Sequence, residues 1–100
     1  MAVSHNYFDY IMTNKHKNVL YIGVTNDIER RIYEHETGEY KWFTKKYNCH
    51  YLVYYEYFTF IEHAIEREKE IKKWRREKKD KLIMSFNPEW RLLNKDIEGI

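Results

Sequence analysis

The chain has 100 residues, of which only 3 are glycine, 1 is proline and 1 is cysteine. So little glycine and proline excludes a collagen-like or low-complexity chain and argues against disorder. The single cysteine, Cys49, excludes a disulfide framework. The sequence contains no CxxC or HxxxH pair, which makes a zinc site unexpected. We therefore expect a reduced, cytoplasmic setting for the protein.

Long apolar runs are also absent. No stretch approaches the roughly 20 apolar residues that span a bilayer. The N-terminus has no basic segment followed by an apolar core, so no signal peptide is expected. We therefore expect no membrane partner.

Neither sign of charge predominates, because 18 Lys and Arg are nearly balanced by 16 Asp and Glu, which gives a net charge of +2. The distribution is uneven. Residues 67–81 hold nine basic and four acidic residues, and residues 41–50 hold three lysines and no acid. Such a run is either an ordinary solvated helix face or a surface that follows phosphates.

The sequence is rich in aromatic residues, with 10 Tyr, 5 Phe and 3 Trp, which predicts an aromatic core for one domain over residues 1–100. Segments 7–13 and 18–23 are rich in β-branched and aromatic residues and predict a hairpin with a loop at 14–17. Residues 51–57 predict a third strand.

The hairpin places two tyrosines together. If Thr13 pairs with Asn18, the antiparallel register sets Tyr10 opposite Tyr21 on one face of the sheet. Gly23, just beyond, permits a close backbone approach.

Helical periodicity appears in three segments, 27–37, 61–75 and 79–86. Asn26 is the expected N-cap of the first helix and Gly38 its stop. Residues 39–50 have no clean periodicity and predict a loop that carries aromatics and lysines.

Polar residues interrupt the apolar stripes of the first two helices. Arg31 and His35 lie four residues apart on the stripe of the first helix. Glu68 lies within the stripe of the second, which is formed by Ile61, Ala64, Ile65 and Ile71. A carboxylate on a buried face is unfavourable unless a cation, a metal or a hydrogen-bond donor meets it.

Each of these residues also has a purely structural interpretation. Any one of ten tyrosines can belong to the core. Arg31 and Glu68 can form a buried ion pair between helices, and His35 can be a hydrogen-bonded core histidine. The combination of three ionisable residues with two tyrosine hydroxyls favours a site over these separate explanations.

The motifs resemble the GIY-YIG nuclease superfamily. Residues 21–35 read YIGVTND, then ERR, then EH, and residues 67–74 read REKEIKKW. The similarity spans about residues 7–90 and is greatest to small stand-alone members of the YhbQ and URI type. The GIY triplet is Phe8-Asp9-Tyr10 here. Val24 stands where repair members carry a lysine that stand-alone members commonly lack.

The resemblance implies an α/β (α+β) fold, a three-stranded antiparallel sheet flanked by helices. It also implies a catalytic set of Tyr10, Tyr21, Arg31, His35 and Glu68. Glu68 would hold one Mg²⁺ or Mn²⁺ ion, and Arg31 would clamp the phosphate. Tyr10 would be the general base, Tyr21 would position the water, and His35 would orient or relay a proton. The sequence leaves open which tyrosine has which role.

We expect a metal-dependent endonuclease with weak sequence preference, acting on DNA more than RNA. The alternatives are a nucleic-acid-binding module without catalysis and a protein-interaction domain whose polar residues form only a buried network. The oligomeric state is open. The expected nucleic-acid contacts are Lys41, Trp42, Lys45, Lys46, Lys72 and Arg75.

Overall fold

A computed structural model of the chain describes residues 6–40 and 42–100, without the side chain of Phe43. The predicted fold class is confirmed, since a three-stranded antiparallel sheet is flanked by helices. The elements, in chain order, are β1 (Tyr7–Thr13), β2 (Leu20–Thr25), α1 (Ile28–Thr37), α2 (Trp42–Lys46), β3 (Tyr51–Phe58), α3 (Ile61–Lys73) and α4 (Arg76–Phe86). The expected contact residue Lys41 lies outside the described residues.

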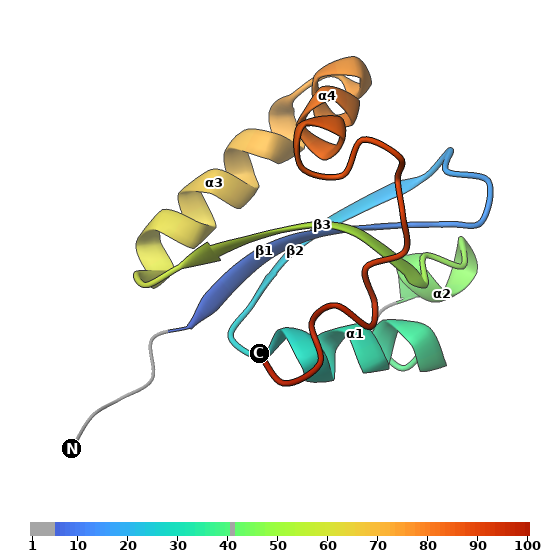
Figure 1. Cartoon of the computed structure of the whole chain (residues 1–100), viewed down its shortest axis with the longest axis horizontal. Coiled ribbons are helices and arrows are strands. Elements are labelled where there is room, and N and C mark those ends of the chain that lie inside the picture. The colour runs from blue at the N-terminus through green and yellow to red at the C-terminus, as the bar shows by residue number, and fades with distance from the viewer. Residues whose placement is uncertain (1–5, 41) are drawn as a thin grey trace.

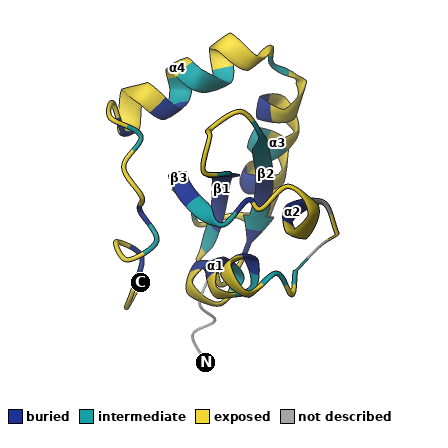
Figure 2. Cartoon of the chain, turned by 90° about the vertical axis from the view of Figure 1, so that its right-hand side faces the viewer, coloured by how far each residue is buried: buried dark blue, intermediate teal, exposed yellow. Residues whose placement is uncertain are grey.

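The sheet has the strand order β2-β1-β3, so the first strand is central and the other two form the edges. Helices α3 and α4 cover one face of the sheet, and α1 and α2 lie on the other (Figure 1). The side chains of β1 contribute to both faces of the sheet, because successive side chains of a strand point to opposite sides. Every residue of β1 after Tyr7 is buried (Figure 2).

The two faces bury separate apolar clusters. On the α1 face, Tyr10 and Met12 pack with Ile28 and Ile32 of α1. On the other face, Ile11 of β1 packs with residues of α3 and α4. The buried members of that second cluster are Ile11, Ile22, Val53, Tyr54, Ile71 and Ile83.

The predicted hairpin register is wrong by two residues. Thr13 pairs with Leu20, and Tyr10 lies opposite Gly23 rather than Tyr21. The Asn14 side chain explains the longer loop, since its Oδ1 accepts hydrogen bonds from the backbone N–H groups of residues 18 and 19. A shift of two residues preserves the face, so Tyr10 and Tyr21 still share one side of the sheet.

The ends of the helices differ in detail from the prediction. Asp27, not Asn26, caps α1, because its side chain accepts from the N–H of Arg30. Gly38 ends α1 in the left-handed conformation, as expected, with φ of 76°. The segment predicted as a loop contains the short helix α2, and α4 begins at Arg76 rather than at residue 79.

The stripe of α3 is narrower than its sequence suggests. Ala64 and Ile71 are fully buried, whereas Ile61 and Ile65 are each 36% exposed. Glu68 lies between the two buried positions, four residues after Ala64 and three before Ile71. It is therefore on the face of α3 that packs on the sheet.

The last residues run from α4 along the edge of the sheet to α1 (Figure 1). The Leu93 N–H donates to the Leu52 carbonyl at 2.8 Å, and the Asn94 side chain accepts from the Leu52 N–H. The Asn87 amide donates to the Val53 carbonyl. Within the described part of the chain, no helix is long and apolar enough to cross a membrane.

Candidate active site

A cluster of tyrosine and histidine side chains lies between the sheet and α1. Tyr10 has no exposed surface, and its hydroxyl lies 2.9 Å from Nε2 of His35, which is equally buried. The ring of Tyr21, which is half-buried, lies 6.2 Å from that of Tyr10 and 5.3 Å from that of His35. The structure therefore brings these three predicted catalytic residues together.

Gly23 makes room for Tyr10. A Cβ atom at residue 23 would lie 2.5 Å from the Tyr10 hydroxyl and 2.6 Å from its Cζ atom. These distances are too short for non-bonded atoms, so any other residue at this position would displace the ring. The glycine of the YIG segment thus lets Tyr10 cross over the neighbouring strand.

Both hydroxyls are strongly biased toward their neutral form. Burial is the main reason that the pKa of Tyr10 lies well above its ordinary value. The proximity of Tyr21 raises this pKa further, whereas hydrogen bonding with Arg31 lowers it. Burial also raises the pKa of Tyr21, as do its hydrogen bond with Tyr40 and the charge of Glu68. Since Tyr10 is enclosed and Tyr21 is not, only Tyr21 can meet a solvent water without rearrangement.

Tyr40 is a member of the cluster that the sequence analysis missed. Its ring lies 4.8 Å from the His35 ring and 6.2 Å from the Tyr21 ring. The Arg31 guanidinium carbon lies 4.1 Å from the centroid of the same ring. The available signal was its position two residues after Gly38, where the chain leaves α1 on the side of Arg31 and His35.

Arg31 points into this cluster from α1. Its side chain is 17% exposed and its Nε lies 3.2 Å from Oε1 of Glu34. Burial acts to lower the pKa of Arg31, but hydrogen bonding with Tyr10 and the proximity of Tyr40 and Glu34 outweigh it and raise the pKa. The Arg31 guanidinium therefore keeps its positive charge and is largely shielded from solvent.

His50 supports His35 from outside the cluster. Its Nδ1 lies 2.6 Å from the backbone carbonyl of His35. A carbonyl only accepts, so this nitrogen carries a proton. The contact fixes the end of α1 against the segment before β3.

Glu68 comes from the opposite layer, on α3. Its carboxylate is 13% exposed and forms an ion pair with Lys72 at 3.2 Å. Its charge reaches Tyr21, because it is among the causes of the raised pKa of that residue. β2 is an edge strand and α3 packs against it, whereas Tyr21 lies on the α1 face of the sheet. The predicted set thus spans two layers instead of one shared interior.

The donor set near Glu68 suits a hard divalent cation held by few protein ligands. Among residues 6–40 and 42–100, no group of three or more His, Cys, Asp and Glu is placed to hold a metal ion. Mg²⁺ is commonly bound through one or two carboxylates, several waters and a substrate phosphate. A single shielded carboxylate fits that mode.

Asp9, in the triplet that departs from the GIY pattern, is an unusual buried acid. It is 1% exposed, and neither carboxylate oxygen has a hydrogen-bond partner among the described residues. Burial, then the charges of Glu56 and Glu68, raise its pKa from 3.8 to about 8, against an opposing effect of Arg67. Asp9 is therefore mostly protonated at neutral pH. The sequence analysis gave it no role.

The expected nucleic-acid contacts fall into two groups. Trp42, Lys45 and Lys46 lie on α2, which begins two residues after Tyr40. Lys72 is engaged with Glu68, and Arg75, at the start of α4, has a largely exposed side chain 3.5 Å from Glu77. The first group is therefore close to Tyr40 along the chain, and in the second Lys72 contacts the predicted metal ligand Glu68.

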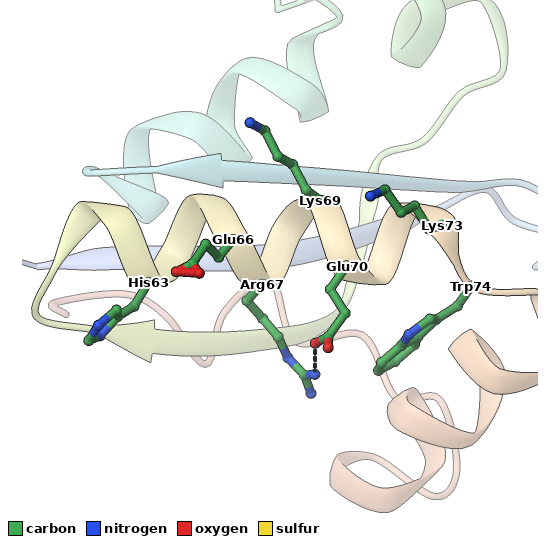
Figure 3. A pocket seen from close by; sticks show the side chains of 7 residues that line it. All are labelled: His63, Glu66, Arg67, Lys69, Glu70, Lys73 and Trp74. Atoms are coloured by element: carbon green, nitrogen blue, oxygen red, sulfur yellow. Dashed lines mark hydrogen bonds and ion pairs between the residues drawn. The ribbon is translucent and has the colours of Figure 1, made fainter.

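A separate groove runs along α3 (Figure 3). It encloses about 660 Å³ and is lined by His63, Glu66, Arg67, Lys69, Glu70, Lys73 and Trp74. Arg67 bridges Glu70 and Glu56, and its guanidinium carbon lies 5.1 Å from the Trp74 ring. Its charges are mixed, with three cationic and two acidic side chains, and none of the predicted catalytic residues lines it.

Comparison with known proteins identifies the family of the chain. Residues 6–81 match the family model described as the GIY-YIG catalytic domain. The chain is 44% identical to a UPF0213 protein of Haloquadratum walsbyi over 63% of this chain and 71% of that one. It is 36% identical to a UPF0213 protein of Natronomonas pharaonis over 83% of this chain and 94% of that one.

A solved structure is also similar. It is the solution NMR structure of a UPF0213 protein from Bacillus halodurans, which is 29% identical, with a TM-score of 0.57. The match covers 94% of this chain and 97% of that one. On both sequence and fold, the chain belongs to the GIY-YIG domain family.

Proposed function

We propose that this protein is a divalent-metal-dependent endonuclease that hydrolyses phosphodiester bonds in DNA with little sequence preference. The observation that carries the proposal is the juxtaposition of Arg31 with the tyrosine cluster, together with the shielded carboxylate of Glu68 that acts on Tyr21. Phosphodiester hydrolysis needs these elements, namely an activated water, neutralised phosphoryl oxygens and help for the leaving oxygen.

Arg31 is the group that binds the scissile phosphate. A guanidinium presents paired N–H donors that match two phosphoryl oxygens, and its charge does not titrate near neutral pH. Tyr40 stacks on this guanidinium and Tyr10 hydrogen-bonds with it, so the fork is oriented before substrate arrives. Preorganisation of this kind favours the transition state over the bound substrate.

Tyr21 is the group that holds the attacking water, and Tyr10 is a positioning residue. The resemblance alone implied that Tyr10 is the general base. We assign it a positioning role instead, because its hydroxyl is enclosed and already bonded to His35. The negative charge of Glu68 raises the pKa of Tyr21. Neutralising that carboxylate therefore lowers the pKa of Tyr21, so that its hydroxyl gives up its proton more readily.

Glu68 is the residue that would hold Mg²⁺ or Mn²⁺. When bound, the ion supplies charge neutralisation at the scissile phosphate and at the leaving 3′-oxygen. In the absence of the ion, Lys72 balances the carboxylate. Lys72 is half exposed and flexible, so it can turn from Glu68 toward a phosphate when the carboxylate is otherwise engaged.

The test compares the wild type with Glu68→Gln, which keeps the shape of the side chain and removes its charge. Single-stranded, duplex and branched DNA are incubated with Mg²⁺, Mn²⁺ or EDTA. We expect cleavage by the wild type only with metal and none by the variant. Metal binding is followed separately by calorimetry, in which the variant should lose the heat of binding.

Wild-type cleavage by Glu68→Gln rules out the metal role of Glu68. A wild type that binds DNA but cleaves none of the three substrates with either metal supports instead a nucleic-acid-binding module without catalysis.

A further inference from the structure

An exposed aromatic and basic surface lies on and just after α2. We define the α2 platform as Trp42, Lys46 and Tyr47. The Trp42 side chain is 69% exposed, and the Lys46 ammonium lies 4.7 Å from the Trp42 ring and 5.4 Å from the Tyr47 ring. A large indole exposed in this way, with a cation over its face, is a typical surface for binding a flat ligand that carries negative charge.

The α2 platform is continuous with the candidate active site. Tyr40 contacts Arg31, His35 and Tyr21, as described above. Trp42 follows only two residues later, so its Cα lies within roughly 7 Å of the Cα of Tyr40. One extended strand of nucleic acid is long enough to contact both aromatic rings.

The charge of this region fits a phosphate backbone. Of the described residues 42–50, two are lysine and none is acidic. The groove along α3, by contrast, carries Glu66 and Glu70 among its basic residues. Electrostatic complementarity therefore favours the α2 side as the path of the strand.

We infer that the α2 platform is a stacking site for unpaired bases, and that the substrate is single-stranded nucleic acid at the segment next to the scissile phosphate. Bases within a duplex are stacked on both sides, so an aromatic side chain can cover only a base that is unpaired or displaced. A base that stacks on Trp42 takes the place of the Lys46 ammonium, which is then free to contact the adjoining phosphate. The inference deepens the proposed nuclease function, but stacking itself requires no catalysis.

The experiment measures binding without cleavage. Fluorescence anisotropy in EDTA gives the affinity for labelled oligothymidylate, oligouridylate and a DNA duplex of the same length. The variants are Trp42→Leu, which removes the ring, Trp42→Phe, which keeps an aromatic face, and Lys69→Gln, which removes one positive charge from the α3 groove. Circular dichroism checks that each variant is folded.

We expect the wild type to bind the single strand more tightly than the duplex. Trp42→Leu should weaken single-strand binding by about tenfold or more, the scale of one lost base–aromatic contact, and change duplex binding little. Trp42→Phe should retain most of the affinity, and Lys69→Gln nearly all of it. Comparison of the two single strands shows whether DNA or RNA is preferred.

Quenching of tryptophan fluorescence gives a second readout. Trp74 and Trp90 are half-buried, so stacking should quench mainly the emission of Trp42, and Trp42→Phe should lose that response. Equal affinity of the wild type for single strand and duplex overturns the inference. So does undiminished binding by Trp42→Leu, or an equal loss in Lys69→Gln. Binding that depends on Trp42 without cleavage under any metal leaves the inference standing and refutes the nuclease proposal.

Discussion

Asp9 and Glu56 face each other directly across β1 and β3, which places two carboxyl groups on the α3 side of the sheet. Glu56 is satisfied, since it accepts hydrogen bonds from Tyr54 and Arg67. Asp9 is buried beside it. The protein thus tolerates an acid in its interior by keeping that acid protonated.

Stability should therefore fall as the pH rises. The folded-state pKa of Asp9 is about 8 and its ordinary value is 3.8. Between these values the unfolded chain releases the proton while the folded chain keeps it, so the free energy of unfolding decreases with pH in this window. Asp9→Asn should remove that slope and raise the melting temperature at pH 8 relative to the wild type. Thermal unfolding from pH 5 to pH 8 measures the effect, with exposed Glu77→Gln as control. An unchanged slope in Asp9→Asn contradicts the assignment.

The two tyrosines should respond differently to loss of the hydroxyl. Tyr10→Phe removes a buried hydrogen bond with His35, so it should lower the free energy of unfolding by about 1–3 kcal/mol. Tyr21→Phe should leave stability nearly unchanged and reduce cleavage by about a hundredfold or more. Chemical denaturation and single-turnover cleavage on the same samples separate the two effects. A stable, inactive Tyr10→Phe would return the general-base role to Tyr10.

Gly23→Ala should destabilise the protein by about 1–3 kcal/mol, because the added methyl group overlaps the Tyr10 ring. Tyr10→Leu provides a matched background, since leucine lacks the Cζ and hydroxyl atoms that the new Cβ would meet. In that background the same substitution should cost far less. A double-mutant cycle by urea denaturation gives the coupling. Equal costs in both backgrounds would show that the overlap is relieved elsewhere.

Arg31→Lys should reduce cleavage by about a hundredfold, because an ammonium cannot present the paired donors of a guanidinium. Binding of DNA should change little, since other basic residues share the ground-state phosphate contacts. Melting temperature, DNA affinity and cleavage are measured on one preparation. A clear fall in melting temperature with unchanged cleavage per folded molecule would leave Arg31 only a structural role.

Arg76 links the loop of the first hairpin to α4 by hydrogen bonds. Its guanidinium donates to the carbonyls of Lys17 and Asn18 at 2.6 and 2.9 Å, and its Nε lies 2.7 Å from Asp80. Arg76→Gln should cost about 1–2 kcal/mol and speed amide exchange near the hairpin loop. The neighbouring Arg75→Gln is the control and should change stability by less than about 0.5 kcal/mol. Equal effects of the two substitutions would exclude the linking role.

Much of the fold could be predicted because local signals and tertiary packing agree. The β-branched and aromatic residues of β1 predicted the strand, the glycine after α1 predicted the end of that helix, and the apolar stripe of α3 predicted the second long helix. The register of the hairpin could not be predicted, because it depends on the Asn14 side chain closing a longer loop. Helix α2 escaped prediction since five residues show no period.

For the site, sequence spacing identified residues but not the layer to which each belongs. Arg31 and His35 followed from one helix face. The position of Glu68 across the edge of β2, and the closure of the cluster by Tyr40, depend on how separate elements pack. The burial of Asp9 could not be predicted for a similar reason. A polar residue in a strand predicts a solvent-exposed face, but here helices cover both faces of the sheet.

The hydrogen bonds of residues 87–94 to β3 have a consequence for association between molecules. An unpaired strand at a sheet edge is a template for another chain. Here Leu93, Asn94 and Asn87 bond backbone groups of Leu52 and Val53, so this segment makes the first part of that edge unavailable to a second copy. A chain cut before Asn87 should expose those groups and self-associate edge to edge, as static light scattering would detect. We therefore expect residues 87–94 to hinder edge-to-edge association as well as to pack on the sheet.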